Sequence, residues 1–177
     1  MAGLVIPNVL KDANVYINGV DFLGKGEVKL PDVEQVTVEH QAMGISGKVE
    51  LPLPGMVSKM EGSIKFKSFN EDAMKVVYNS GTAFHISVFA SVQAYDPSTG
   101  VMDEFQVKAV LRAFFKKVSM PDIKQAQDEG AEVSYSANYY KLTVNGEDVV
   151  EVDPINYIYQ VGGVDLLEKT RANLGMK

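Results

Sequence analysis

The sequence predicts a mainly β fold, a β-sandwich tending towards a barrel, with one internal helix and one short C-terminal helix. Two Asn-Gly pairs, at residues 18–19 and 145–146, separate runs in which apolar and polar residues alternate, the pattern of β-hairpins. Long alternating runs also fill the middle of the chain. Apolar residues at helical spacing are confined to two short segments. This alternation indicates antiparallel sheets with one buried and one wet face.

Length and composition are those of one ordinary globular domain, residues 1–177. The chain has no cysteine, which excludes disulfides, thiol nucleophiles and zinc-finger sites, and it has only two histidines. Its formal net charge of −6 argues against general nucleic-acid binding, which requires basic patches. No apolar run approaches the ~18 residues that span a bilayer, and no N-terminal signal is seen, so we expect synthesis in the cytoplasm.

Two half-buried strands are predicted at residues 33–42 and 60–67, with a polar face on each. We expect the two polar faces to lie side by side as partners. The polar residues are Gln35, Thr37, Glu39, Gln41, Glu61, Ser63, Lys65 and Lys67, opposite the buried Val36, Val38, Ile64 and Phe66.

Residues 43–59, between these strands, are predicted to form an extended hairpin arm. The segment is longer than a hairpin loop requires, and its three glycines and two prolines oppose regular sheet. Its apolar residues are Ile45, Val49, Leu51, Leu53, Met56 and Val57. Exposed apolar side chains on such an arm imply a partner surface. The alternative is a lid folded back over the domain's own core.

The internal helix is predicted at residues 70–79. Asn70 suits the N-cap, and Glu71 and Asp72 favour the positive end of the helix dipole. Its apolar stripe, predicted to be core, is Ala73, Met74, Val77 and Tyr78. Two long strands follow, and their predicted inner faces are Phe84, Ile86, Val88, Ala90, Val92 and Ala94, then Phe105, Val107, Ala109, Leu111, Ala113 and Phe115.

The next strand, residues 131–144, changes its alternation near Tyr139. Val133, Tyr135 and Ala137 are apolar at odd positions, whereas later apolar residues fall at even positions. A slip of one residue moves side chains to the opposite face of a sheet, so we predict a bulge or a crossing between sheets near Tyr139.

The C-terminal forty residues begin with a hairpin at Asn145-Gly146, whose returning strand ends at Asp153-Pro154. Residues 164–177 are predicted to form the C-terminal helix and tail. Asp165 is the expected N-cap, with Glu168 completing a capping box, and Gly175 is the expected left-handed C-terminal cap. A helix this short is marginal alone, so it must dock on another surface.

No catalytic constellation stands out, and we predict no enzyme, cofactor or metal site. The acidic run Glu147, Asp148, Glu151 and Asp153 lacks EF-hand spacing, and in a regular strand Asp148 points away from the other three. Residues 44–47, Gly-Ile-Ser-Gly, are one residue short of a nucleophile elbow. A small acidic β-sandwich enzyme stays as a distant alternative.

Residues 139–156 and 161–175 resemble the C-terminus of the major tail tube protein of contractile-tailed phages and of R-type phage-tail-like bacteriocins. The matching residues are Asn145, Gly146, Glu151, Val152, Asp153, Ile155, Asn156, Gly163, Val164, Asp165, Leu167, Arg171, Asn173, Leu174 and Gly175. The N-terminal hairpin matches at Asn14, Val15, Tyr16, Ile17, Asn18, Gly19, Gly24, Leu30 and Pro31. The sequence departs from the family pattern at Gly162 and at Ala113.

The resemblance implies hexameric rings whose inner sheets join into one continuous β-barrel, stacked as the tube for DNA ejection. It implies contacts with tail sheath, baseplate and tail-terminator proteins, a tape measure protein in the lumen, and DNA that passes without tight binding. The protein would reside in a virion tail or tail-like particle. An R-type bacteriocin tube without genome passage and a type VI secretion-like tube are the alternatives.

Three sets of assembly residues are predicted within this picture. The polar residues Gln35, Thr37, Glu39, Gln41, Glu61, Ser63, Lys65 and Lys67 are the lumen-lining candidates. The apolar residues of the arm, Ile45, Val49, Leu51, Leu53, Met56 and Val57, are the ring-stacking candidates. Asp165, Leu167, Arg171 and Leu174 are the subunit-contact candidates.

Overall fold

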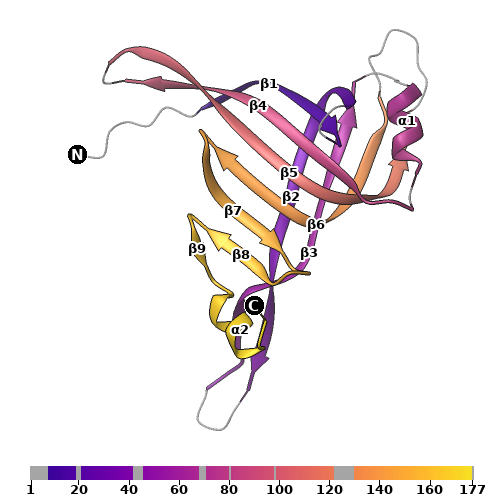
Figure 1. The fold of residues 1–177 in the computed structure, drawn as a ribbon. Helices are drawn as coiled ribbons and strands as arrows, with labels where there is room; N and C mark the ends of the chain where they lie inside the picture. The colour runs from indigo at the N-terminus through magenta and orange to yellow at the C-terminus, as the bar shows by residue number, and fades with distance from the viewer. Residues whose placement is uncertain are drawn as a thin grey trace.

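The computed structural model describes residues 8–18, 21–41, 46–67, 71–79, 81–97, 99–121 and 130–176. For residues 21–25 it describes the backbone alone. The fold is mainly β, as predicted (Figure 1). Its elements are β1 (Val9–Ile17), β2 (Asp21–His40), β3 (Val49–Phe66), α1 (Glu71–Val77), β4 (Phe84–Asp96), β5 (Val101–Ser119), β6 (Glu132–Val144), β7 (Glu147–Asp153), β8 (Ile158–Val161), β9 (Val164–Asp165) and α2 (Glu168–Asn173).

The sheet closes on itself to form a barrel. Its strand order is β3-β2-β1-β4-β5-β6-β7-β8-β9, and a further pairing joins β3 to β6. β6 divides its edge between two partners: Glu132–Ser136 pair with β3, and Tyr140–Val144 pair with β7. Strands β1 to β6 therefore form a closed barrel, and β7, β8 and β9 continue from it as a flap (Figure 1).

The change of face in β6 lies one residue before Tyr139, and the prediction is confirmed. Arg112 pairs with Tyr139 and Ala113 with Ala137, so Asn138 is the extra residue of a β-bulge. Val133, Tyr135 and Ala137 are buried before the bulge, and Tyr140 is buried after it. The bulge lets one strand contribute to the barrel with its first half and to the flap with its second.

The core fills the barrel and is covered at one end by α1. The predicted inner faces are confirmed in part, by the buried Phe84, Ile86 and Val88 at the start of β4 and by the buried Ala109, Leu111, Ala113 and Phe115 on β5. On α1, Ala73 and Val77 are buried and Met74 packs against the cluster. The prediction for Tyr78 is wrong, because it follows the end of α1 and is 58% exposed.

A close backbone approach fixes the seam where β3 meets β6. The Tyr135 hydroxyl donates to the carbonyl oxygen of Lys29 on β2 (2.8 Å) and passes directly over Gly62. A Cβ at Gly62 would lie 2.4 Å from this hydroxyl and 2.5 Å from the Lys29 carbonyl oxygen. Only glycine leaves room for the bond, which ties β2, β3 and β6 together.

The C-terminal hairpin has the predicted turn, with positive φ at Asn145 (50°) and Gly146 (82°). Asn18 also has a positive φ of 50°, whereas Gly19 lies outside the described residues. The pair Ile17 and Asp21 leaves three residues between β1 and β2. The N-terminal connection is therefore longer than the two-residue turn that the Asn-Gly pair predicts.

The arm predicted at 43–59 is largely regular strand. β2 continues to His40, and β3 begins at Val49 and includes both prolines and Gly55. Gln35 pairs with Val57 and Thr37 with Pro52, so four residues on β3 face one on β2. Pro54 lies within this wide irregularity and Pro52 pairs with Thr37, both at a strand edge, where proline is tolerated. We call Gln35–His40 with Val49–Val57 the distal ribbon; it extends beyond the barrel (Figure 1).

The C-terminal helix is shorter than predicted. Val164 and Asp165 pair with β8 as β9, and α2 begins only at Glu168. The capping box is absent: Leu167 occupies the N-cap position without a side-chain bond, and Asp165 instead accepts from the Leu167 N–H (2.9 Å). The glycine cap is confirmed, because Gly175 has φ 68° and the N–H groups of Gly175 and Met176 donate to Ala172 and Arg171 in a Schellman motif.

Candidate functional site

The lumen-lining candidates fall into two separate groups, so their predicted side-by-side pairing is wrong. Glu61, Ser63 and Lys65 pair with Asp32, Lys29 and Glu27 on the barrel wall. Gln35, Thr37 and Glu39 instead lie on the distal ribbon, opposite Val57, Pro52 and Glu50. Ile64 and Phe66 are buried as predicted, but Val38 on the ribbon is 36% exposed. The pairing error arises because the sequence pattern does not encode the register between β2 and β3.

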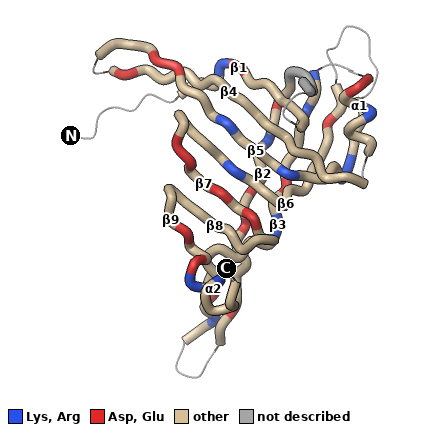
Figure 2. Tube along the Cα trace, viewed as in Figure 1, with Lys and Arg blue, Asp and Glu red and all other residues tan. Residues whose placement is uncertain are grey.

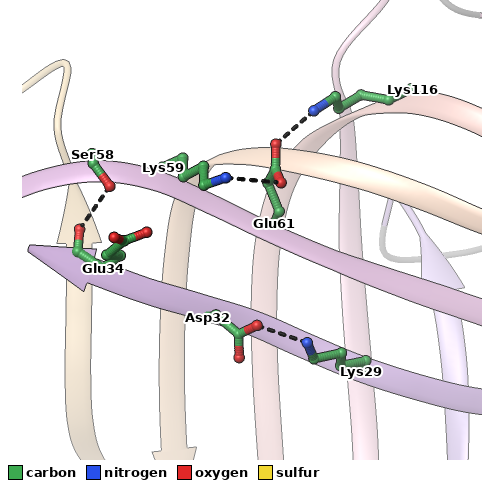
Figure 3. A network of polar contacts seen from close by, with 7 residues as sticks. All are labelled: Lys29, Asp32, Glu34, Ser58, Lys59, Glu61 and Lys116. Carbon is green, nitrogen blue, oxygen red and sulfur yellow. Dashed lines mark hydrogen bonds and ion pairs between the residues drawn. The ribbon is translucent and has the colours of Figure 1, made fainter.

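The outer face of the barrel wall is a network of matched charges (Figure 3). Lys29 Nζ donates to Asp32 Oδ2 (2.7 Å). Glu61 lies between two cations, with Lys116 Nζ at 2.6 Å and Lys59 Nζ at 3.7 Å. The hydrogen bond from Lys116 holds the pKa of the Glu61 carboxyl below its usual value. These cations each have a carboxylate neighbour, so this part of the wall offers a passing phosphate little uncompensated charge.

A second polar network joins the barrel to the flap. Arg112 on β5 donates through Nε to Asn138 Oδ1 (2.9 Å), its guanidinium lies 5.9 Å from the Tyr139 ring centroid, and Nη2 lies 3.7 Å from Asp153 Oδ2. Asp153 is 4% exposed and accepts from the backbone N–H groups of Ile155 (3.1 Å) and Asn156 (3.2 Å) and from Asn156 Nδ2 (2.7 Å). This carboxylate both ends β7 and holds the turn into β8.

The acidic run divides between the faces differently from the prediction, because Asp148 lies on the same side of β7 as Glu151. Val149 is an extra residue in β7, because Leu142 pairs with Val150 and Thr143 with Asp148. Lys141 Nζ consequently reaches both Asp148 (2.8 Å) and Glu151 (3.3 Å). Figure 2 shows the acidic segments of β7 beside a basic segment of β6. The carboxylates serve as partners of lysine rather than as a cluster of their own.

Tyr139 extends this network from the bulge. Its hydroxyl donates to Glu151 Oε1 (2.9 Å), and burial raises the pKa of Tyr139 to about 12. The hydroxyl therefore stays a donor across the physiological range. The sequence analysis did not identify the hydrogen bond between Arg112 and Asn138. The change in alternation near Tyr139 did locate the bulge in which Asn138 lies.

The distal ribbon is held by the C-terminal segment. Leu167 is 3% exposed, and a Cβ at Gly55 would lie 2.7 Å from its side chain. Gly55 also has φ 81°, a conformation that disfavours any residue with a side chain. Of the ring-stacking candidates, Val49, Leu51, Leu53 and Met56 are 38–49% exposed, Val57 is partly buried, and Ile45 lies outside the described residues.

Three of the four subunit-contact candidates make contacts inside the chain. Arg171 Nη2 is paired with Asp165 Oδ2, and Nη1 donates to the Tyr157 carbonyl oxygen (2.7 Å). The hydrogen bond from Arg171 lowers the pKa of the Asp165 carboxyl. Leu167 is buried, whereas Leu174 is 58% exposed. Asp165 and Arg171 lock α2 against the flap and thereby seat Leu167 on the ribbon.

Within the part of the chain that the structure describes, no group of three or more His, Asp or Glu side chains is placed to hold a metal ion. No helix among the described residues is long and apolar enough to cross a membrane. The described residues instead form three surfaces: the barrel wall with its ion pairs, the distal ribbon, and the C-terminal segment that the Asp165–Arg171 pair holds in place.

A barrel with a projecting ribbon that exposes apolar side chains is the setting for the comparison with known proteins. The model of the family described as phage tail tube protein FII matches residues 7–175. The chain belongs to this family. It is 28% identical over 176 residues to the tail tube protein of Escherichia phage P2, covering 98% of this chain and all of that protein. It is 24% identical over 164 residues to the major tail tube protein of Serratia phage KSP20, with 92% of each covered.

Solved structures share the fold. The anti-feeding prophage cap, a tube-terminating cap, matches with a TM-score of 0.56 and 14% identity over 81% of this chain and 95% of that chain. The sheath/tube terminator of an extracellular contractile injection system matches with a TM-score of 0.54 and 13% identity over 80% of this chain and 99% of that one. As a member of the tail tube family, the chain is a structural tail tube subunit.

Proposed function

We propose that this chain forms hexameric rings that stack into the inner tube of a contractile phage tail, with the channel serving DNA ejection. The single observation that carries the proposal is the combination of a closed barrel with a two-stranded ribbon that extends beyond it. A barrel protects its own strand edges, whereas the ribbon leaves edges and apolar side chains that need a neighbour.

The partners proposed for the tube are tail sheath, baseplate and tail-terminator proteins, with a tape measure protein in the lumen before DNA passes. The structural relative from a sheath–tube complex supports a sheath partner, and the relative that is a sheath/tube terminator supports a terminator partner. The particle would be made in the host cytoplasm. A bacteriocin or secretion-type tube remains the second candidate, and the two phage relatives, at 28% and 24% identity, favour the phage.

Assembly is the first test. We expect purified chain to form rings or tubes as its concentration rises, because another copy of the chain can cover the exposed apolar residues of the ribbon. Light scattering and electron microscopy over a range of protein and salt concentrations measure this. A strict monomer under every condition would count decisively against the proposal. Capsid and terminase genes beside this one would separate a phage from a bacteriocin.

We further propose that the outer face of β2, β3, β6 and β5 lines the channel, with Lys65 on the wall and Glu39 nearer the next ring. Its support is the charge-matched network of Figure 3. In tubes, Lys65→Cys should react far more slowly than in unassembled chain with a thiol reagent coupled to a protein too wide for the channel. Tyr78→Cys, at the exposed position directly after α1, is the matched control and should react equally in both. Equal reaction of Lys65→Cys in both states would rule out the lumen.

A further inference from the structure

The ladder between the two strands of the distal ribbon is interrupted close to the barrel. Residues 53–56 of β3 face Val36 alone, and Pro52 and Pro54 have no N–H group to donate. A two-stranded ribbon is marginally stable by itself, and an interrupted ladder weakens it further. The ribbon therefore needs support from another part of the molecule if it is to keep one direction relative to the barrel.

That support lies at the interruption itself. Gly55 is buried, although Pro54 and Met56 on either side of it are exposed. A Cβ at Gly55 would lie 2.7 Å from the side chain of Leu167, and α2 lies beside this part of the ribbon (Figure 1). Leu167 is 3% exposed and belongs to the same cluster of packed side chains as the barrel core. It thus connects the interrupted base of the ribbon with the core of the subunit.

One side chain, Arg171, holds Leu167 in this place. Its Nη2 pairs with Asp165 Oδ2, and its Nη1 donates to the carbonyl oxygen of Tyr157 (2.7 Å) in the turn between β7 and β8. Asp165 Oδ1 accepts from the Leu167 N–H (2.9 Å), and the Leu167 carbonyl oxygen accepts from the Arg171 N–H (2.9 Å). The guanidinium fork therefore joins β9, α2 and the β7–β8 turn around Leu167.

We propose that Asp165, Leu167 and Arg171 form a brace that fixes the direction of the distal ribbon before the subunit meets a neighbour. Arg171 is a positioning residue that acts through Leu167. The inference rests on the proposed function and adds a conformational requirement to it. A ribbon that points in its docking direction only part of the time binds with an apparent affinity reduced by that fraction, and the brace keeps the fraction high.

The exposed side chains of the ribbon argue against a masking role for the C-terminal segment. Leu51, Leu53 and Met56 are 38–49% exposed while Leu167 is in place. A segment that kept the ribbon inactive would cover these side chains, because exposed apolar groups are what a neighbour binds. Leu167 contacts the base of the ribbon instead, so the brace leaves the apolar surface of the ribbon free.

Loss of Arg171 should loosen the ribbon without loosening the barrel. In the unassembled chain, Arg171→Ala should speed hydrogen exchange of the ribbon amides by roughly tenfold or more, because the charged hydrogen bonds that oppose local opening are lost. The amides along the β3–β6 seam are the internal reference and should keep their exchange rates. Lys169→Ala is the matched control, because it removes one positive charge from an exposed position on the same helix and should leave both rates unchanged.

Tube growth should follow the order of the ribbon. Arg171→Ala and Leu167→Ala should each raise the protein concentration needed for tube growth by roughly tenfold or more, because only the correctly directed fraction binds. The double variant should grow tubes no worse than Leu167→Ala alone, since Arg171 acts by holding Leu167. Leu167→Met should grow tubes nearly as the parent chain does, because it keeps an apolar side chain of similar volume. Lys169→Ala should grow them as the parent chain does.

Arg171→Lys keeps the comparison available if Arg171→Ala does not fold. Lysine retains the charge but lacks the planar fork that reaches Asp165 and Tyr157 together. It should therefore show the same two defects, faster ribbon exchange and a higher concentration for tube growth, at a smaller size.

The outcomes separate the brace from the proposed function. Unchanged ribbon exchange in Arg171→Ala, or equal acceleration in ribbon and barrel, would overturn the brace. Tube growth by Arg171→Ala at a lower concentration than the parent would show a masking segment, and additive defects in the double variant would show that Arg171 does not act through Leu167. Either result would overturn the inference. Failure of the parent chain to form any ring or tube would overturn the proposed function, while exchange in the unassembled chain would still test the brace.

Discussion

Removing the distal ribbon should abolish tube growth and leave a folded subunit. In the variant, residues 36–56 are replaced by Asn-Gly, so that the turn closes directly on the pair Gln35↔Val57. None of the fully buried core side chains lies in the deleted segment. Leu167 loses its seat on Gly55, and exposing one leucine costs about 2 kcal/mol. We therefore expect a melting temperature lower by about 4–8 °C and no tubes by electron microscopy.

Leu167→Ala in the full-length chain is the matched control, because it loses the same buried contact and keeps the ribbon. Its tube yield shows how much of the defect is due to the loss of this contact alone. Tubes of normal length from the shortened chain would remove the ribbon from stacking. An unfolded shortened chain would show that the segment is instead a lid over its own core, the alternative that the sequence leaves open.

Local patterns predicted most of the barrel. Alternation of apolar and polar residues predicted β4, β5 and β6 and the bulge at Asn138, because a strand with one buried face has this alternation in its own sequence. The Asn145-Gly146 turn and the Gly175 cap were predictable for a related reason. Each depends on a positive φ that few residues adopt.

Register was not predictable, and the misplacement of the lumen-lining candidates and of the acidic run follows from it. The lumen-lining candidates on residues 35–41 and 61–67 have the right alternation but do not face each other, because β2 and β3 are offset by the irregularity opposite Val36. The carboxylates of Asp148 and Glu151 meet one lysine because Val149 is extra. Bulges of this kind are fixed by pairing partners far away in the sequence.

The proline and glycine content of residues 43–59 predicts an interruption of regular sheet, yet most of the segment is β3. The prolines are tolerated because the described part of β3 pairs with β6 only from Glu61, which leaves the ribbon's outer edge without ladder bonds to lose. Gly55 has a separate cause. Its positive φ and its contact with Leu167 depend on how the C-terminal segment packs against the ribbon, which the local sequence does not predict.

Asp153→Ala should be the most destabilising single substitution on the flap. The residue is 4% exposed and satisfies three donors from Ile155 and Asn156, with Arg112 at 3.7 Å. Its removal leaves these donors and a partly buried guanidinium without their acceptor, which for a buried ion pair costs about 3–5 kcal/mol. We expect a loss of that size in the free energy of unfolding, measured by urea denaturation.

Asp148→Ala is the matched control on the same strand. Asp148 is also a carboxylate paired with a cation, Lys141, but its side chain is 55% exposed, and water screens exposed pairs so that they contribute little to stability. Asp153→Asn should fall between the two, because one amide oxygen still accepts from the backbone while the new N–H₂ group faces the donors of Asn156 and Arg112. If Asp153→Ala and Asp148→Ala unfold at the same urea concentration, the carboxylate does not hold the β7–β8 turn. The junction of barrel and flap would then depend on the apolar contacts of Tyr140, Val152 and Tyr159 instead.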